Sequence, residues 1–358
     1  MKNLSANLWL GGPVILSVGL VLLFVSHSRQ DFAIWYAANI FPVFTYTIGL
    51  FFGLFPISVA ELFLIIAVLF AVWKIFLFIF YFRRFKFRRK HLLVISYVLP
   101  GLFLMFVLTA GINYNRESYA YHIGITVQPT HTDALIEMYL MLVERAHSLA
   151  PLIETDAYGR FMLSTYDIHS YANLSMRNLH NTYGGLNAHF PRAKAPFLSV
   201  GLSHLNIGGI FFPWTMEAHY NGDMPATNIP FTINHELAHV AGHMREDEAN
   251  FIAYLASRDS GHIDFEYSAV YMALSYTLNA MRRVMSADLY SEYFDLLPEQ
   301  LKHDFAAARA YWQRFQGRPA EIQRRANDAY LRLNQQFDGV MSYGRMVDLM
   351  LAYYHRPN

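Results

Sequence analysis

Long apolar runs fill the first third of this 358-residue chain, whereas the remaining two thirds mix apolar and polar positions. Three of the runs, at residues 9–25, 56–81 and 91–112, have about the 20-residue length that a helix needs to cross a bilayer. The first run is not followed by a small-residue cleavage motif, so we expect a retained span rather than a signal peptide. The pattern therefore predicts a membrane domain over residues 1–112 with about three transmembrane helices.

The charges around these runs predict their orientation. A dense basic loop at residues 83–90 separates the second run from the third. Because lysine and arginine are enriched in cytoplasmic loops, we expect this loop and Lys2 in the cytoplasm. The aromatic segment 32–54 is interrupted by proline and glycine, so we expect it at the outer interface or re-entering the membrane without crossing it. Three crossings then predict a multi-pass protein of the cell (inner) membrane with residues 113–358 outside the cytoplasm.

The second part of the chain has mainly helical periodicity. Residues 133–148 place apolar side chains at spacings of three and four, which predicts an amphipathic helix. The same periodicity recurs at residues 265–285, 298–314, 319–337 and 343–354. Residues 195–228 differ, because glycine and proline interrupt short apolar pieces that suggest strands and loops. The expected fold is mainly α, with transmembrane helices followed by a predominantly helical α+β domain.

Composition limits the chemistry of this domain. Apolar residues make up 54% of the chain and charged residues 15%, a balance that supports a membrane-embedded part. The formal net charge is +1, and neither a basic stripe nor a nucleic-acid motif is present, so we expect no nucleic-acid partner. The chain contains no cysteine, so a metal ion would have to be held by histidine, aspartate or glutamate.

A histidine pair with metal-ligand spacing lies in the segment 233–250, INHELAHVAGHMREDEAN. On a helix, His235 and His239 project from one face and can hold one ion, while Glu236 can reach a water beside it. Two imidazoles, one carboxylate and an open fourth position are a ligand set of catalytic zinc. The motif therefore predicts a Zn²⁺ site with His235 and His239 as ligands and Glu236 as the general base.

The third ligand must come from beyond the helix that carries the motif. If that helix ran straight on, Glu246 would lie about 10 Å further along its axis than His239, too far for a shared ion. A turn at Gly242 would bring Glu246 back to the metal and place Asn250 where it can brace a ligand. At the other end of the helix, Thr232 is in a position to cap its start.

Other residues compete for these roles. Glu248 is the alternative third ligand, and Asp264 or Glu266 could supply one from a separate helix. His243 fits a helix end or the surface better than a contact with the metal or the substrate. A loop-rich stretch before the motif could line the site or stabilise an oxyanion, although loop packing explains it equally well, and its polar residues are Glu217, His219 and Tyr220.

Several sequence blocks carry a family resemblance, namely residues 55–59 (FPISV), 113–119, 213–218 (PWTMEA), 230–239 (PFTINHELAH), Gly242 and 246–255 (EDEANFIAYL). Through them, most of the chain resembles a family of bacterial membrane proteins of unknown function that combine several N-terminal spans with an HExxH zinc-peptidase domain. The resemblance implies metallopeptidase chemistry through the motif alone.

The last block is also similar to zincins whose third ligand is a glutamate in an E-x-x-A-D or E-x-x-A-N pattern. Glu246, Ala249 and Asn250 match that pattern, which implies Glu246 as the third ligand and a zincin-like α+β domain. Glutamate zincins usually leave a longer gap after the second histidine. Metzincins share the glycine at the position of Gly242, but Arg245 stands where their third histidine would be.

These observations favour a membrane-anchored, zinc-dependent metallopeptidase that hydrolyses a peptide or protein substrate outside the cytoplasm. An intramembrane protease is disfavoured, because residues 243–248 are too polar for a spanning helix. The non-enzyme alternative is a catalytically inactive zinc-binding sensor or envelope assembly protein. A structural zinc site is closed by four protein ligands, whereas a catalytic site keeps one position open, so the coordination separates the two hypotheses.

Overall fold

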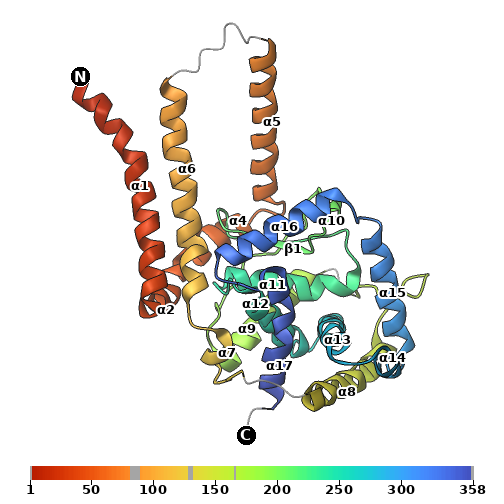
Figure 1. Ribbon diagram of the computed structural model, residues 1–358. Coiled ribbons are helices and arrows are strands. Elements are labelled where there is room, and N and C mark those ends of the chain that lie inside the picture. Colours follow the sequence, from red (N-terminus) through yellow and green to blue (C-terminus); the bar gives the residue numbers. More distant parts are fainter. Residues whose placement is uncertain (1, 81–88, 128–131, 165–166, 356–358) are drawn as a thin grey trace.

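A computed structural model describes residues 2–80, 89–127, 132–164 and 167–355 (Figure 1). The chain is mainly helical, as its periodicity predicted. The long apolar helices α1 (Lys2–Ser28), α5 (Val59–Phe80) and α6 (Arg89–Thr109) project together from a globular part. α1 and α6 begin, and α5 ends, at the end distant from the globular part, so this arrangement suits three crossings. Residues 83–88 of the predicted basic loop lie outside the described residues.

Within the described residues, four helical stretches are long and apolar enough to cross a membrane: Leu10–Ser28, Gln30–Gly53, Val59–Phe80 and Leu92–Thr109. This supports a membrane protein, although three spans were expected. Gln30–Gly53 is the segment that we expected not to cross. It is divided into α2 (Gln30–Asn39), α3 (Phe41–Phe44), a π-helical turn η1 (Thr45–Gly49) and α4 (Leu50–Gly53). The number of crossings and the side of the globular part remain predictions.

This divided segment packs against the globular part instead of standing with the projecting helices (Figure 1). Phe41 is fully buried, and the Thr45 hydroxyl donates a 2.9 Å hydrogen bond to the carbonyl oxygen of Val240. A position packed against the globular part suits an interfacial segment better than one surrounded by lipid.

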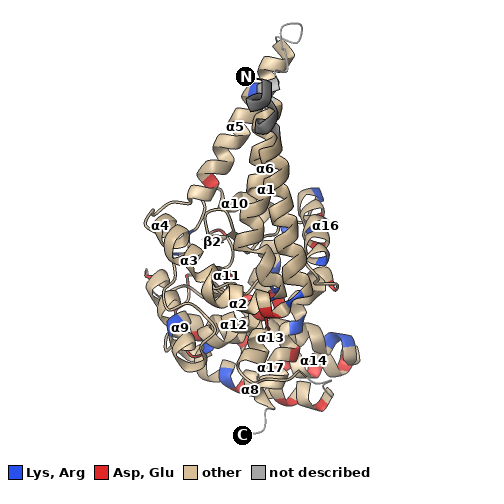
Figure 2. Cartoon of the chain, turned by 90° about the vertical axis from the view of Figure 1, so that its left-hand side faces the viewer, with Lys and Arg blue, Asp and Glu red and all other residues tan. Residues whose placement is uncertain are grey.

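The projecting helices differ in their partners. α1 lies directly on α6, because a Cβ atom at Gly12 would come within 1.8 Å of the Ser96 carbonyl oxygen. Small residues allow this close approach between helices in lipid. From Leu62 to Phe80, by contrast, most of the large apolar side chains of α5 are exposed. Figure 2 shows that acidic and basic residues gather on the globular part and are sparse on all three helices, as contact with lipid requires.

The globular part is built around three central helices, α11 (Ile229–Val240), α12 (Glu246–Arg258) and α13 (Ile263–Val284). Their core is apolar, and Phe251, Ile252 and Leu255 of α12 are fully buried. The surrounding α-helices are α7 (Tyr119–His122), α8 (Thr132–Leu149), α9 (Ile168–Tyr183), α10 (Ser199–His204), α14 (Ala287–Asp295), α15 (Glu299–Gln313), α16 (Arg318–Leu333) and α17 (Met346–Tyr354). Short 3-10 turns are η2 (Gly111–Asn115), η3 (Ala150–Leu152), η4 (Ala226–Asn228) and η5 (Gly339–Arg345).

The loop-rich stretch contains the strands of one small sheet, β1 (Gly209–Phe212) and β2 (Glu217–Tyr220). They pair antiparallel, with Gly209 opposite Tyr220 and Phe212 opposite Glu217. Lys194 bridges the outer side of β2, so β1 forms the open edge. These are the only strands in the described part of the chain, and the finer assignment of a zincin-like α+β domain therefore stays a prediction.

A buried ionic group holds the base of α5 on this sheet. The Glu217 carboxylate accepts hydrogen bonds from the amides of Val59 (3.0 Å) and Ala60 (2.8 Å), the first residues of α5. Lys194 pairs with Glu217 at 2.5 Å, and both side chains are almost completely buried. Because the first amides of a helix lack partners within the helix, Glu217 satisfies them from another element.

Candidate metal centre

A sharp turn at Gly242 places α12 beside α11. Gly242 has φ +88°, and the His243 amide donates to the Ala238 carbonyl oxygen at 3.0 Å, the closing bond of a helix C-terminal turn. A Cβ atom at Gly242 would also lie 2.9 Å from the ring of Phe41. Glycine therefore meets both the conformational and the steric requirement here. The structure thus contains the reversal that the sequence predicted at this residue.

The rotation of α11 about its axis is fixed by a buried polar contact on its inner face. The Asn234 side-chain amide donates to the hydroxyls of Ser175 on α9 (3.0 Å) and Ser257 on α12 (2.9 Å). Because Asn234 faces the core, the neighbouring His235 can face the other way. The expectation that Thr232 caps α11 is wrong, because the helix begins at Ile229 with Pro230 in its first turn. Thr232 therefore lies inside the helix, and it lines the pocket beside the histidines.

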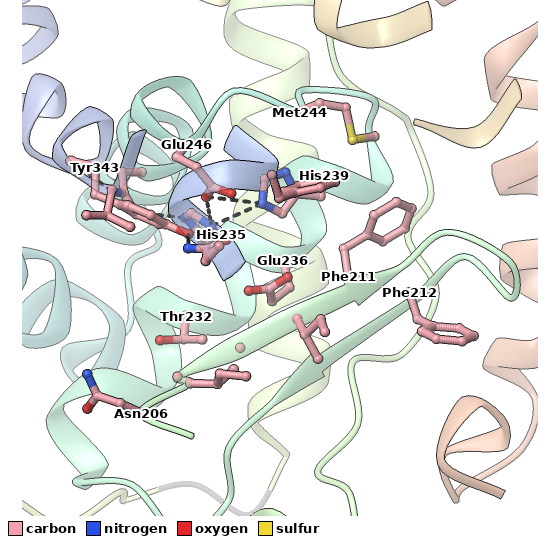
Figure 3. Close-up of a pocket in the computed structure, with 18 of the residues that line it drawn as sticks. Asn206, Phe211, Phe212, Thr232, His235, Glu236, His239, Met244, Glu246 and Tyr343 are labelled. Carbon is pink, nitrogen blue, oxygen red and sulfur yellow. Dashed lines mark hydrogen bonds and ion pairs between the residues drawn. The ribbon is translucent and has the colours of Figure 1, made fainter. Parts of the chain in front are cut away.

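His235, His239 and Glu246 converge in this structure (Figure 3). The Nε2 atoms of the two histidines are 3.1 Å apart. Oε2 of Glu246 lies 3.1 Å from Nε2 of His235 and 3.6 Å from Nε2 of His239. This oxygen is buried and makes no hydrogen bond with ideal geometry in the described part of the chain, and the three ligand atoms surround a common point.

The opposite nitrogen of each ring is occupied. Nδ1 of His235 lies 2.8 Å from Oδ1 of Asn250, whose amide nitrogen donates to the Tyr343 carbonyl oxygen at 3.1 Å. Nδ1 of His239 lies 2.7 Å from the carbonyl oxygen of His243. Both partners accept, so both Nδ1 atoms donate. When both rings are neutral, as metal binding requires, their Nε2 lone pairs point at the common point, which is the orientation that metal-binding histidines need.

The distances between these atoms fit a tetrahedral ion. Bonds of about 2.0–2.1 Å at tetrahedral angles separate neighbouring ligand atoms by about 3.3–3.4 Å. The three observed separations, 3.1, 3.1 and 3.6 Å, are close to that value. Two imidazole nitrogens and a carboxylate oxygen are also donors that Zn²⁺ prefers. His235, His239 and Glu246 therefore suit zinc in both chemistry and geometry.

The charges of this cluster depend on one another. Burial works against the ionised form of Glu246, but the two neighbouring imidazoles outweigh it and hold the pKa of the carboxyl well below its usual range. Burial likewise disfavours the charged ring of His239, but the Glu246 carboxylate prevails and raises the pKa of His239 to about 9. The ionised Glu246 carboxylate thus stabilises a positive charge beside it, although His235, His239 and Glu246 are all buried.

Glu236 faces the same pocket from the side (Figure 3). Strand β1 runs directly over it, because a Cβ atom at Gly209 would lie 2.3 Å from Oε1 of Glu236. Burial raises the pKa of Glu236 to about 7, and the Glu246 carboxylate adds to the rise while the two histidines oppose it. A carboxyl group with a pKa near neutrality is suited to exchange a proton during a reaction.

The competing candidates point elsewhere. Glu248 pairs with Arg245 and accepts from the Tyr119 amide at 3.3 Å. The ring of His243 lies edge-on to Tyr119, with Nε2 3.1 Å from the Gly185 carbonyl oxygen, and only its backbone carbonyl supports the site. Asp264 binds the backbone and hydroxyl of Ser164, and Glu266 pairs with Arg145.

The polar residues before the motif also serve another purpose. Glu217 holds α5, and His219 contacts the Ser58 hydroxyl at 2.8 Å. Neither residue lines the pocket. Of the three, Tyr220 packs at the edge of the core against His169. The loop-packing interpretation of this stretch is therefore the one that matches the structure.

A cavity of about 710 Å³ opens beside the trio. Its walls include parts of the chain that are distant from the motif in sequence and could not be predicted from it. These are β1 and the following turn, the end of α6, and α16. Tyr276 of α13 and Tyr343 of η5 direct their rings into it, and Tyr343 stacks on His235 at 6.4 Å between ring centroids. Sequence reasoning missed both tyrosines, and no spacing links them to the histidines.

Comparison with known proteins adds one finding. A family model described as a protein of unknown function (DUF3810) matches residues 36–351. The chain belongs to this family. The expected membership of a family of unknown function is thus confirmed, and the DUF3810 match includes most of the divided segment, α5, α6 and nearly the whole globular part. No curated protein and no solved structure matches the chain.

Proposed function

We propose that this DUF3810 protein is a membrane-anchored zinc metallopeptidase that hydrolyses peptide bonds outside the cytoplasm. The observation that carries the proposal is the convergence of His235, His239 and Glu246 on one point, with Glu236 beside it and a cavity in front. Zinc held by these ligands would polarise a substrate carbonyl and lower the pKa of the attacking water toward neutrality.

The residues around the cavity supply the rest of the chemistry. Glu236 is placed to accept a proton from the attacking water and to pass it to the leaving amine, a role that its near-neutral pKa favours. Burial beside β1 keeps this carboxylate away from bulk solvent. Tyr343 and Tyr276 face the cavity from the other side and are the available hydroxyl donors for the developing oxyanion.

The open edge of β1 supplies a place for the peptide. The Asn221 amide donates to the Gly208 carbonyl oxygen, so the antiparallel alternation turns the backbone groups of Gly209 and Phe211 away from β2. An extended peptide can add to such an edge through main-chain hydrogen bonds. Because Gly209 lies over Glu236, a peptide in this position would pass the catalytic carboxylate.

The same geometry favours a catalytic site over a structural one. Structural zinc is enclosed by four protein ligands, whereas the group found among the described residues contains three. The two other candidate ligands that the sequence offered nearby face away, since Glu248 is paired with Arg245 and the ring of His243 points to Gly185. The fourth position would therefore be left to water or substrate.

Metal analysis of the protein purified in detergent tests the ligands. We expect about one zinc per chain, lost in Glu246→Gln and retained in Glu248→Gln. This control is matched, because both glutamates are buried in the first turn of α12 and only one faces the histidines. A wild-type protein without zinc or another divalent metal, or equal loss in the two variants, would contradict the assignment.

Hydrolysis of a quenched fluorescent peptide library tests the reaction. Glu236→Gln keeps the shape of the side chain and should retain zinc, but it should lower turnover by about 100- to 10,000-fold, the usual contribution of a general base. Zinc content measured on the same preparation separates loss of the base from loss of the metal. Unchanged turnover in Glu236→Gln would refute the role of this residue.

A further inference from the structure

The base of α5 shows where the globular part meets the bilayer. α5 has 22 residues, which at about 1.5 Å per residue gives roughly 33 Å, close to the thickness of the hydrocarbon core. Its side chains are exposed and apolar almost from the start, so the lipid boundary lies near Val59. Glu217 binds the amides of Val59 and Ala60, and the end of the β1–β2 hairpin therefore lies at that boundary.

A second candidate membrane helix also contacts this hairpin. The hairpin turn carries Trp214, whose indole N–H donates to the Leu102 carbonyl oxygen at 2.9 Å. Leu102 lies inside the candidate span Leu92–Thr109. Tryptophan is enriched where proteins cross the interface between water and lipid. Two independent contacts thus place this turn beside membrane-crossing segments.

The surface around the base of α5 is also apolar. Glu61, in the first turn of α5, accepts from the amides of Phe197 and Leu198 at 2.8 Å, which fixes the loop before α10 at this level. The exposed apolar side chains here are Phe51, Leu54, Phe55, Ile57, Phe197, Leu198 and Val200, and Leu54 and Phe197 are more than three quarters exposed. Since this surface is continuous with α5, the bilayer interface is the partner that fits it.

Strand β1 extends from that boundary to the carboxylate of Glu236, so its length gives the distance between them. Phe212 pairs with Glu217 at the base of α5, and Gly209 lies over Glu236. The three steps from Phe212 to Gly209 span about 10 Å at roughly 3.4 Å per residue. The cavity is also lined by Phe106 of the membrane helix α6 and by Ala110, the residue that follows this helix. A peptide along β1 would therefore have one end at the membrane while its middle passes Glu236.

We propose that the substrate is a membrane-tethered polypeptide, cut about three to five residues from the point where it enters the lipid. This inference rests on the proposed peptidase function and specifies its substrate class. A soluble peptide would have to find a site that lies close to the lipid boundary, whereas a tethered segment is already held at about the correct distance from it. The tether can be a spanning helix or a lipid anchor, because the observed geometry concerns only the distance from the boundary.

Peptides with spacers of graded length test the position of the cut. A quenched peptide library is coupled at either end to a phospholipid through spacers of about 3, 10 and 30 residues, which extend to roughly 10, 35 and 100 Å. The full-length chain is reconstituted in the same vesicles. We expect the shortest spacer to be cleaved at least about 10-fold faster than the longest spacer and the free library.

The long spacer is the control for tethering itself, because it raises the local concentration of peptide without holding the peptide at the boundary. Equal rates for short and long spacers, or faster cleavage of the free library, would overturn the inference and leave the peptidase function standing. If no library is cleaved by a zinc-loaded protein, the proposed function fails and the substrate class falls with it.

A second measurement tests the geometry without activity. The chain has no cysteine, so Phe197→Cys and Leu140→Cys can each carry one environment-sensitive fluorophore. Both positions are exposed, but Leu140 belongs to α8, and this helix lies on the side of the globular part that is distant from the projecting helices (Figures 1 and 2). Nitroxide-labelled lipids should quench the label at residue 197 strongly and the label at residue 140 only slightly. Equal quenching would place the boundary elsewhere and overturn the inference.

Discussion

Replacement of Asn250 by alanine should weaken zinc binding without removing any ligand. Oδ1 of Asn250 accepts from Nδ1 of His235 at 2.8 Å, and the side chain is 2% exposed. Loss of such a partner usually costs about 10- to 100-fold in metal affinity. At about 1.4 kcal/mol per factor of ten, this corresponds to roughly 1.4–2.8 kcal/mol.

Two physical effects contribute to this loss. Without Asn250, the Nδ1–H of His235 is buried without an acceptor, which costs about 1–3 kcal/mol. The ring also loses the contact that keeps its proton on Nδ1 and its Nε2 lone pair toward the metal. Asn250→Asp retains an acceptor and should recover part of the affinity, although its carboxylate would face the Tyr343 carbonyl oxygen that now receives a hydrogen bond.

Competition with a chelator of known affinity measures the effect, and Asn187→Ala is the matched control. Asn187 is also buried, and its amide donates to the Val240 carbonyl oxygen at 3.2 Å, at the end of α11 but away from both ligand rings. Asn187→Ala should therefore lower the unfolding temperature while the dissociation constant for zinc stays within about twofold of wild type, as expected for a change outside the ligand shell. Equal weakening in both variants would show that general loosening of the domain, rather than the orientation of His235, controls the affinity.

Further predictions concern the turn, the base of α5 and the response to pH. Gly242→Ala should cost about 1–3 kcal/mol more than Gly261→Ala in chemical unfolding, because both residues have positive φ but only Gly242 has a neighbour within 3 Å of the new Cβ; equal costs would contradict the close packing at the turn. Glu217→Gln leaves a buried lysine unpaired and should cost about 3–5 kcal/mol, whereas Glu299→Gln, in an exposed pair, should cost less than about 1 kcal/mol. Burial lowers the pKa of His169 to about 4. As the pH falls from about 6.5 to about 4, this histidine takes up a proton in the unfolded chain but not in the folded one, so the free energy of unfolding should fall by at most about 3 kcal/mol. His169→Gln should remove this part of the fall in a pH series of thermal unfolding, and an unchanged series would show that other groups cause it.

Much of the architecture follows from local rules that act within a few residues. The apolar length of the runs predicts α1, α5 and α6, and the spacing of the later helices predicts α8, α13 and α15 closely. The reversal at Gly242 was predictable too, because glycine after a helix that must fold back is a local requirement of the backbone. The histidine pair needs only a helix to converge.

Contacts between distant segments were not predictable in this way. From the sequence Glu217 looks like an acidic residue of a loop, and only the folded chain brings it to the amides of Val59 and Ala60, 158 and 157 residues earlier. The predicted cap at Thr232 was wrong because α11 already begins at Ile229, about one turn earlier, with Pro230 in its first turn. The cavity walls from α6 and α16 also depend on packing across the whole chain. Such pairings have no period and no fixed spacing in the sequence.

The choice between Glu246 and Glu248 lies between these two cases, because a local argument was available. Residues two apart on a helix differ by about 200°, so only one of the two carboxylates can face α11. Residues four apart share a face, and the residue four beyond Glu246 is Asn250, which can accept from a histidine, whereas Ile252 follows Glu248 and cannot. A ligand and the acceptor that orients its neighbour must come from one face. The spacing of Glu246 and Asn250 therefore favours Glu246 even without the fold, and the two side chains do meet His235 together.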